Sequence, residues 1–272
     1  MPLVNRGPSG AEPSTDGATS RLAASLAAAR RGRFAIASRR GTSEAVSLEA
    51  AYELGGDLER EWLSAGWNPV GWKLGFTNQA LWSRLGLDRP IRARIYEQTL
   101  CTGALDIADL VQPRIEPEIV VGFGADVPRN SSTHTIAAAI EWAAAGLEVV
   151  RCHFANWEMT PAEAVADAGV HAALAVGRPT RVDSEAARGL VGASCELFRD
   201  GMLVATGRGA DVLGGPLDAL RWLLRELPGG LCAGEIVTTG TLTPAVPVEP
   251  GQCWEHRISA LIALEPVMLS LR

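Results

Sequence analysis

Two glutamates, Glu116 and Glu118, could do chemistry because they stand two positions apart in segment 114–121. The apolar, β-branched residues around them predict a strand, and side chains two apart on a strand project from the same face. Two carboxylates beside apolar residues repel each other and are poorly solvated, so a divalent cation is the simplest way to keep both ionised. A third carboxylate, Glu148, lies in another short apolar segment, thirty residues after Glu118. Three carboxylates, with water and substrate at the remaining positions, suit a hard ion such as Mg²⁺ or Mn²⁺.

The spacing of these glutamates also fits a simpler arrangement. Acidic residues at alternate positions are common on strands, and Glu116 and Glu118 could line the solvent-facing side of an edge strand. The four histidines lack the spacing of a metal-binding helix, and the five cysteines contain no C-x-x-C pair. A metal site in this chain would therefore depend on carboxylates.

One lysine, Lys73, occupies an unusual place in the short apolar segment 70–77, which is predicted to be a strand. Burial would lower its pKa and make it useful as an acid or base, or the lysine would pair with a carboxylate. The alternative is a surface lysine whose stem follows apolar residues while its ammonium group stays in water.

Length and charge limit the class of protein. The chain has 272 residues, a net charge of −6 and 47% hydrophobic residues, which predicts one large domain, or one domain with a smaller lobe, and argues against nucleic acid as the main partner. No apolar run approaches the roughly 20 residues of a membrane span.

Five widely spaced cysteines indicate a reduced, cytoplasmic protein. The Gly-, Pro- and Ser-rich residues 1–19 predict a disordered tail and not a secretory signal.

Propensity and periodicity divide the remaining chain into an N-terminal helical lobe, 20–69, and a body, 70–272. Helices are predicted at 20–37, 47–65, 78–87, 135–146, 160–168 (opened by a Thr-Pro-Ala-Glu capping box) and 216–227. Further strands are predicted at 92–100, 147–150, 235–243 and 253–264, with a hairpin over 190–207 that turns at Asp200-Gly201. Because no regular βα unit repeats, the pattern predicts an α+β fold.

Several catalytic motifs are missing from the sequence. The Gly-x-Gly pairs at 122–124 and 207–209 do not continue into a dinucleotide-binding loop, and the chain has no P-loop and no G-x-S-x-G elbow. Cys152 and His153 are adjacent, so on a strand they would point to opposite faces and could not act as a nucleophile and its base. These absences leave the carboxylates and Lys73 as the candidate chemistry.

Six segments in register carry a family resemblance: Gly71-Trp72-Lys73-Leu74-Gly75-Phe76-Thr77, Glu116-Pro117-Glu118, Leu147-Glu148-Val149, His153-Phe154-Ala155-Asn156-Trp157, residues 207–217, and Thr239-Gly240-Thr241-Leu242-Thr243 with Pro247-Val248. From about residue 21 to residue 263 the chain resembles the 2-keto-4-pentenoate hydratase and 4-oxalocrotonate decarboxylase family. The resemblance implies a fumarylacetoacetate hydrolase-like fold, in which a mixed β-sheet roll is flanked by helices.

The resemblance also implies roles for particular residues. Glu116, Glu118 and Glu148 match the positions that bind one Mg²⁺ or Mn²⁺ in the family, and Lys73 matches a lysine that acts as an acid or base or stabilises charge. Three residues are expected to contact a 2-keto acid substrate, with Thr241 holding its carboxylate: Leu74, Thr77 and Thr241.

The activity implied is hydration of a 2-hydroxy-2,4-dienoate through a dienolate whose negative charge the metal stabilises. The same dienolate permits the alternative, decarboxylation of a vinylogous 2-keto acid. An acylpyruvate hydrolase would need a histidine–glutamate pair toward the N-terminal side, where no obvious pair is found.

A non-catalytic partner subunit is the remaining alternative. The family also implies a homo-oligomer, or a complex with a paralogous enzyme of the pathway, and no membrane or nucleic-acid partner.

Three positions depart from the family pattern. Ile91 stands where an acidic residue is common, and Ala168 stands where an asparagine is common. Glu158 replaces a lysine, and this reversal of charge makes Glu158 a further candidate acid or base. Because the three departures spare the predicted metal ligands, they predict an altered substrate pocket around conserved chemistry.

Overall fold

Two β-sheets form the framework of the chain, of which the computed structural model describes residues 15–85 and 87–272. The larger sheet has the strand order β2-β1-β11-β5-β6-β7-β3, with β12 beside β5 and β8 beside β6. Its strands are β1 (Pro69–Gly75), β2 (Ile91–Tyr96), β3 (Leu100–Cys101), β5 (Arg114–Phe123), β6 (Ile140–Val150), β7 (His171–Val176), β8 (Thr180–Arg181), β11 (Ile236–Thr241) and β12 (Val246–Pro247). Parallel and antiparallel pairs are mixed in it, as predicted for an α+β fold.

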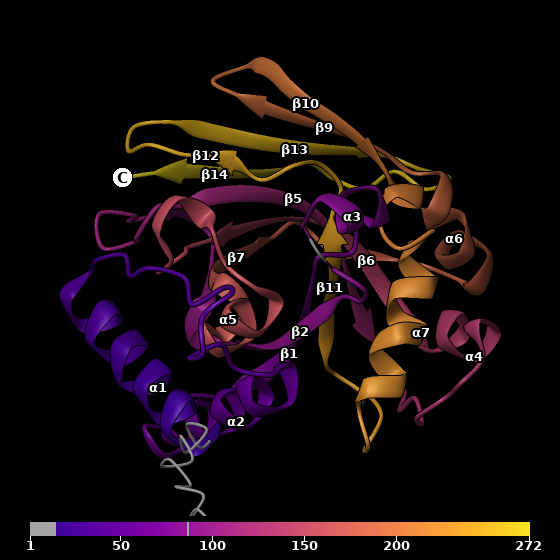
Figure 1. Cartoon of the computed structure of the whole chain (residues 1–272). Helices are drawn as coiled ribbons and strands as arrows, with labels where there is room; N and C mark the ends of the chain where they lie inside the picture. Colours follow the sequence, from indigo (N-terminus) through magenta and orange to yellow (C-terminus); the bar gives the residue numbers. More distant parts are fainter. Residues whose placement is uncertain (1–14, 86) are drawn as a thin grey trace, which may run out of the picture.

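The smaller sheet has the order β10-β9-β13-β14-β4 and lies across one side of the larger sheet, at the top of Figure 1. Its strands are β4 (Gly103–Leu105), β9 (Ser194–Arg199), β10 (Met202–Arg208), β13 (Cys253–Ser259) and β14 (Val267–Leu271). The predicted hairpin is confirmed: β9 and β10 pair across a turn at Asp200 and Gly201, both of which have positive φ.

Seven α-helices in the described part of the chain surround the sheets. They are α1 (Thr15–Gly32), α2 (Leu48–Ser64), α3 (Trp82–Leu85), α4 (Thr133–Ala139), α5 (Pro161–Ala166), α6 (Ser184–Gly189) and α7 (Pro216–Glu226). The predicted capping box opens α5, where Thr160 and Glu163 cap each other. Figure 1 shows α1 and α2 on one flank of the larger sheet, with α4, α6 and α7 on the other.

The N-terminal predictions need two corrections. Residues 1–14 of the predicted tail lie outside the described residues, but residues 15–19 belong to α1, so the tail prediction extends too far. The predicted helix 20–37 ends at Gly32, because Arg33 adopts a left-handed φ of 55° that cannot continue a right-handed helix.

The prediction of a helix over 135–146 is wrong for its second half. The helix α4 ends at Ala139, and β6 begins at Ile140 and runs through Ala143, Ala144 and Ala145 in the middle of the larger sheet. Alanine is a strong helix former, but intrinsic propensity amounts to less than tertiary packing. Because β6 pairs with β5 on one side and with β7 and β8 on the other, this packing makes the segment a strand.

The centre of the larger sheet positions the predicted chemistry. β5 is an interior strand between β11 and β6, which rules out the edge-strand alternative for Glu116 and Glu118. A separate apolar cluster attaches the N-terminal helices to this framework, since Leu22 and Leu26 of α1 pack with Val150 and Phe154. None of the helices in the described ranges is long and apolar enough to cross a membrane.

Candidate active site

Glu116, Glu118 and Glu148 come together on one face of the larger sheet. Glu116 and Glu148 are direct partners in the antiparallel pairing of β5 with β6, and Glu118 follows two residues along β5. One carboxylate oxygen from each lies within 4.8 Å of the others. Glu118 and Glu148 are fully buried, whereas Glu116 is half-buried and lines a cavity.

The two buried carboxylates each have one oxygen bound by the protein and one oxygen left over. The backbone N–H of Gly240 donates to Glu118 Oε2 at 2.9 Å, and His171 Nδ1 lies 2.7 Å from Glu148 Oε1. Glu118 Oε1 and Glu148 Oε2 are buried without a hydrogen-bond partner among the described residues. Buried polar atoms are rarely left unpaired, and hard oxygen donors suit Mg²⁺ and Mn²⁺. The residues present therefore fit a divalent cation.

Lys73 is buried on β1 and pairs with one of these carboxylates. Its Nζ lies 3.2 Å from Glu148 Oε1 and donates to the backbone carbonyl of Gly169 at 3.1 Å. Burial acts to lower the pKa of Lys73, but the nearby carboxylates, Glu148 foremost, outweigh burial and raise that pKa above its ordinary value. In the metal-free protein Lys73 is therefore an ammonium group paired with Glu148.

The surroundings also separate the pKa values of the three carboxyl groups. Burial and the charge of Glu148 raise the pKa of Glu118 well above its usual range, and burial likewise raises the pKa of Glu116. For Glu148 burial is outweighed by Lys73 and by the hydrogen bond from His171, so its pKa lies below the ordinary value. Without a cation, the cluster cannot hold three negative charges at neutral pH.

A cavity of about 260 Å³ opens above Glu116 and Lys73. Most of its wall is apolar, formed by Leu74, Phe76, Leu87, Ile91, Trp157, Met159, Val170, Pro244 and Ala245. Arg114 is the one cation besides Lys73 among the described residues that line it. The Arg114 guanidinium lies 4.5 Å from the centroid of the Trp157 ring.

The predicted substrate-binding residues all line this cavity. The hydroxyl of Thr77 is buried without a hydrogen-bond partner among the described residues, and Leu74 forms part of the apolar wall. The hydroxyl of Thr241 is already engaged, because it donates to the carbonyl of Thr243 at 2.7 Å. Gly240 has φ of +114°, and a Cβ there would lie 2.0 Å from Thr77 Oγ1, so this turn requires glycine.

The three departures fall in different places. Ile91 is buried and lines the cavity. Glu158 is exposed, and although Trp157 and Met159 on either side of it line the cavity, Glu158 does not. Ala168 faces a separate cavity between α2 and the sheet. Of the three, only Ile91 therefore contributes to the wall of the active-site cavity.

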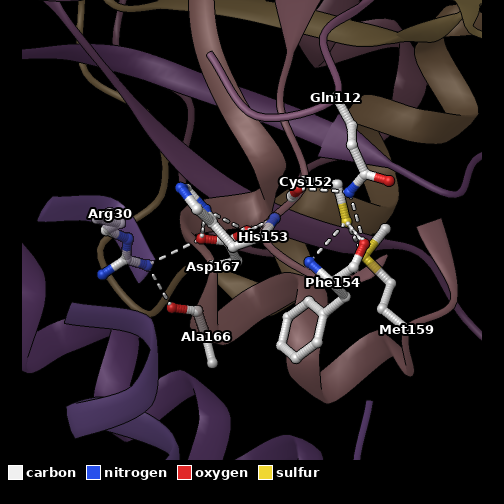
Figure 2. Close-up of polar contacts among 8 residues, drawn as sticks. All are labelled: Arg30, Gln112, Cys152, His153, Phe154, Met159, Ala166 and Asp167. Carbon is white, nitrogen blue, oxygen red and sulfur yellow. Dashed lines mark hydrogen bonds and ion pairs between the residues drawn. The ribbon is translucent and has the colours of Figure 1, made fainter. Parts of the chain in front are cut away.

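A hydrogen-bonded cluster is centred on Asp167 (Figure 2), two residues before Gly169 in the chain. Asp167 lies between His153 and Arg30: the His153 backbone N–H donates to it at 3.0 Å, His153 Nδ1 is 2.9 Å away, and Arg30 Nη2 is 3.2 Å away. Cys152 points instead toward Met159, so Cys152 and His153 diverge as predicted. Three consecutive residues after Asp167 have positive φ, which are Ala168, Gly169 and Val170.

Sequence reasoning missed three contributors to the site. His171 bridges Glu148 and Thr99 Oγ1, which lies 2.8 Å from His171 Nε2. The carbonyl of Gly169 accepts from Lys73, and Arg114 lines the cavity two residues before Glu116. Only Arg114 had a usable signal, since alternate positions on a strand share a face.

The chain has extensive similarity to known proteins. The family described as fumarylacetoacetate (FAA) hydrolase C-terminal matches residues 96–267. A TodF product hydratase of Pseudomonas putida F1 is 32% identical over 255 residues, which cover 90% of this chain and 93% of the relative. A 2-keto-4-pentenoate hydratase of Paraburkholderia xenovorans LB400 is 31% identical over 83% of this chain and 86% of its own length. The structure of 4-oxalocrotonate decarboxylase from Pseudomonas putida G7, complexed with magnesium and adipate, superposes with a TM-score of 0.85 at 25% identity over 98% of this chain and 100% of that one.

Proposed function

This chain belongs to the fumarylacetoacetate hydrolase family, and on that premise we propose that it is a divalent-metal-dependent hydratase acting on a 2-hydroxy-2,4-dienoate or its 2-keto-4-enoate tautomer. The observation that carries the proposal is the cluster of Glu116, Glu118 and Glu148 beside Lys73, beneath a cavity with a mainly apolar wall.

Glu116, Glu118 and Glu148 would hold the cation, for which we propose Mg²⁺ or Mn²⁺. When bound, the ion supplies Lewis-acid stabilisation of negative charge on the 2-oxo oxygen of the substrate. Since Glu116 lines the cavity and the other two carboxylates are buried, the substrate approaches from the side of Glu116.

Lys73 places its ammonium group at the edge of this cluster, 3.2 Å from Glu148 Oε1. A cation on the three glutamates would weaken their effect on the pKa of Lys73, so we propose Lys73 as an acid or base or as a charge stabiliser toward the substrate. Glu148 and the Gly169 carbonyl hold the ammonium group in place. Thr77, whose hydroxyl has no partner in the described part of the chain, is the proposed donor to the substrate carboxylate, and Leu74 and Thr241 shape the wall beside it.

The apolar wall favours hydration over the alternatives. A dienoate has one carboxylate and a hydrocarbon tail, and Ile91, Trp157 and Met159 provide an apolar surface for such a tail. Glu158 is exposed and outside the cavity, so we assign it no part in the reaction.

One observation supports decarboxylation of a vinylogous 2-keto dioate as the second candidate. Arg114 lines the same cavity and donates no side-chain hydrogen bond to any described residue, so it could bind a second carboxylate in the bidentate manner typical of arginine.

The two reactions separate in an ultraviolet assay. The protein would be mixed with 2-hydroxypenta-2,4-dienoate or with 2-oxohex-3-enedioate, with Mg²⁺ and with EDTA, while release of CO₂ is measured. Hydration predicts loss of the dienoate chromophore without CO₂ in the presence of Mg²⁺. Loss of the dioate with release of CO₂ would instead establish the decarboxylase.

Replacing Arg114 provides a second test of this choice. Arg114→Met should leave hydration of the dienoate within about threefold of wild type, but should slow any turnover of the dioate by roughly 10- to 100-fold, mainly through KM. Arg257→Met is the matched control, because Arg257 also lies over an aromatic ring, 4.3 Å from the centroid of Phe198, but in the other sheet. Equal loss of both activities in Arg114→Met would contradict a selective role in binding a second carboxylate.

The cellular setting is also a proposal. All five cysteines are free thiols, which suits a reducing cytoplasm. We further propose that the protein is a homo-oligomer and works in aromatic catabolism; the relatives that are named as hydratases support the reaction class of this proposal.

A further inference from the structure

A second cavity lies behind the active site, between α2 and the opposite face of β1 and β2. Its volume is about 250 Å³, and it shares no described lining residue with the active-site cavity. Neighbouring residues on the strands line different cavities: Lys73 and Ile91 line the active-site cavity, whereas Trp72 and Arg92 line the second cavity. Figure 1 shows α2 beneath β1 and β2, and side chains from all three elements line the cavity.

Arg92 supplies this cavity with a guanidinium that has no hydrogen-bond or ion-pair partner among the described residues. Its guanidinium carbon lies 4.8 Å from the Tyr52 ring centroid and 5.2 Å from that of Trp72. Its Nε is buried without a partner, and none of its side-chain nitrogens donates to a described residue. A buried donor without an acceptor is costly, so this arginine is suited to receive an anion.

Arg94, on the same strand as Arg92, differs from it in having carboxylate partners. Arg94 bonds Glu59 at 3.0 Å and Glu235 at 2.9 Å while its guanidinium carbon lies 3.7 Å from the Trp72 ring centroid. With Arg94 bound to Glu59 and Glu235, Arg92 is the guanidinium of this cavity that has no carboxylate partner among the described residues. One unpaired guanidinium suits a ligand with a single carboxylate.

A pair of glycines keeps the cavity open. Gly55 and Gly56 lie within α2, have ordinary helical φ values and line the cavity. Glycine is among the poorest helix formers, yet a Cβ at Gly55 would only meet the Val165 carbonyl oxygen at 3.9 Å, and one at Gly56 would only meet Arg60 Nη1 at 3.6 Å. No described atom lies close enough to exclude a side chain at either position. The two glycines therefore leave open a part of the cavity that larger side chains would fill.

We propose that this cavity is a second, non-catalytic binding site for a small planar carboxylate, with Arg92 on the carboxylate and the planar body against the aromatic side chains. The Tyr52 hydroxyl accepts from the Arg92 backbone N–H, so its own proton is free for a ligand oxygen. Trp62 and Trp72 form apolar walls that suit a flat hydrocarbon body. The cavity is smaller than a typical pocket for a drug-sized ligand, which limits the ligand to about the size of benzoate.

This site adjoins the catalytic lysine through the backbone. Trp72 precedes Lys73 on β1, and Ala168 precedes Gly169, whose carbonyl accepts from Lys73. A ligand in the second cavity would contact Trp72 and Ala168, which precede Lys73 and Gly169 in the chain, without touching Lys73 or Gly169 themselves. The proposal does not depend on which reaction the active site performs.

The test is calorimetric titration of the full chain with benzoate, repeated with benzamide, which has the same shape without the charge. Benzoate should bind with a dissociation constant on the order of 1 mM, and benzamide should not saturate. Arg92→Gln should weaken benzoate binding by about tenfold or more. Arg89→Gln is the matched control and should bind as wild type, because Arg89 pairs with Asp88 and lines another cavity.

A second variant guards against misfolding of Arg92→Gln. Gly56→Leu fills the cavity from the helix side and improves the helix propensity of α2, so it should fold and also lose benzoate. The proposal is overturned if wild type shows no saturable binding of benzoate. It is equally overturned if both Arg92→Gln and Gly56→Leu bind benzoate as wild type does, since the carboxylate then sits elsewhere, as in the active site.

Discussion

At the scale of single residues, the three glutamates differ because each has a different neighbour. Lys73 and His171 lower the pKa of Glu148, whereas burial and the charge of Glu148 raise the pKa of Glu118 despite its hydrogen bond from the Gly240 N–H. An acid whose pKa is raised in the folded state destabilises that state as pH rises above the unfolded value. The metal-free protein therefore carries this cost at neutral pH.

Replacing Glu118 with glutamine should abolish activity and raise the stability of the metal-free protein. Glu118→Gln removes one ligand, so we expect hydration to be abolished and Mg²⁺ or Mn²⁺ to lose its stabilising effect on thermal unfolding. It also removes the cost of a buried carboxyl, so the metal-free variant should be more stable than metal-free wild type by about 1–3 kcal/mol.

Thermal unfolding with and without Mn²⁺ checks both expectations. Glu141→Gln, at an exposed glutamate that pairs with Arg181, serves as the control and should keep activity and metal response. A Glu118→Gln protein that still gains stability from Mn²⁺ as wild type does would argue against Glu118 as a ligand.

At the scale of elements, the turn after α5 is the part of the site under strain. Ala168, Gly169 and Val170 all have positive φ, and non-glycine residues in that region cost of order 1–3 kcal/mol each. Hydrogen bonds from Arg30 and His153 to Asp167 hold the start of this turn. The turn in return aims the Gly169 carbonyl at Lys73.

Substituting the central glycine tests this element. In Gly169→Ala the new Cβ would lie 2.6 Å from Ala93 Cβ and 3.3 Å from Lys73 Cδ, at a φ of +64°. We expect a loss of about 2–4 kcal/mol in the free energy of unfolding and a fall in kcat of roughly tenfold or more, because Lys73 must move.

Gly41→Ala separates backbone strain from the clash. Gly41 has a φ of +72° with nothing within 4 Å of the new Cβ, so this control should lose only about 1 kcal/mol and no activity. The double variant Gly169→Ala/Ala93→Gly should recover part of the loss by removing the closer contact. Wild-type kcat in Gly169→Ala would contradict the role given to this turn.

Some elements of the structure could be predicted from the sequence, and others could not. The spacing of Glu116 and Glu118 and the capping box at Thr160 follow local rules, so the site's main carboxylates and α5 were predictable. The alanines of β6 follow no local rule, since their strand geometry comes from pairing on both sides. His171 could not be predicted, because its contacts with Glu148 and Thr99 join positions 23 and 72 residues apart.

At the scale of the whole molecule, one buried histidine links the two sheets and ties stability to pH. His256 on β13 of the smaller sheet donates from Nδ1 to the carbonyl of Gly146 on β6 at 2.9 Å, and its Nε2 is buried without a partner among the described residues. Burial lowers the pKa of His256 from 6.5 to about 4. The folded protein therefore keeps this histidine neutral when the unfolded chain already binds a proton.

The pH dependence follows from that difference. Burying His256 as a neutral side chain costs no stability above pH 6.5, where the unfolded chain is also neutral at this residue. As pH falls from 6.5 toward 4, the unfolded chain binds a proton that the folded protein does not, and the free energy of unfolding drops by about 3 kcal/mol in all. His256→Asn keeps a donor near Gly146 but cannot titrate, so its free energy of unfolding should fall less steeply than that of wild type over this range. Urea unfolding at a series of pH values measures the slopes, with His134→Asn at an exposed histidine as control. Equal slopes for His256→Asn and wild type would contradict the assignment.

The central claim is that a divalent cation held by Glu116, Glu118 and Glu148 makes this chain a hydratase. The most direct measurement is a titration of the metal-free protein with Mn²⁺, in which bound metal and hydration of 2-hydroxypenta-2,4-dienoate are measured on the same samples. We predict one tight Mn²⁺ per chain, with activity rising in proportion to occupancy. Full activity before any Mn²⁺ is bound, or a saturated protein that leaves the dienoate unchanged, would contradict the claim.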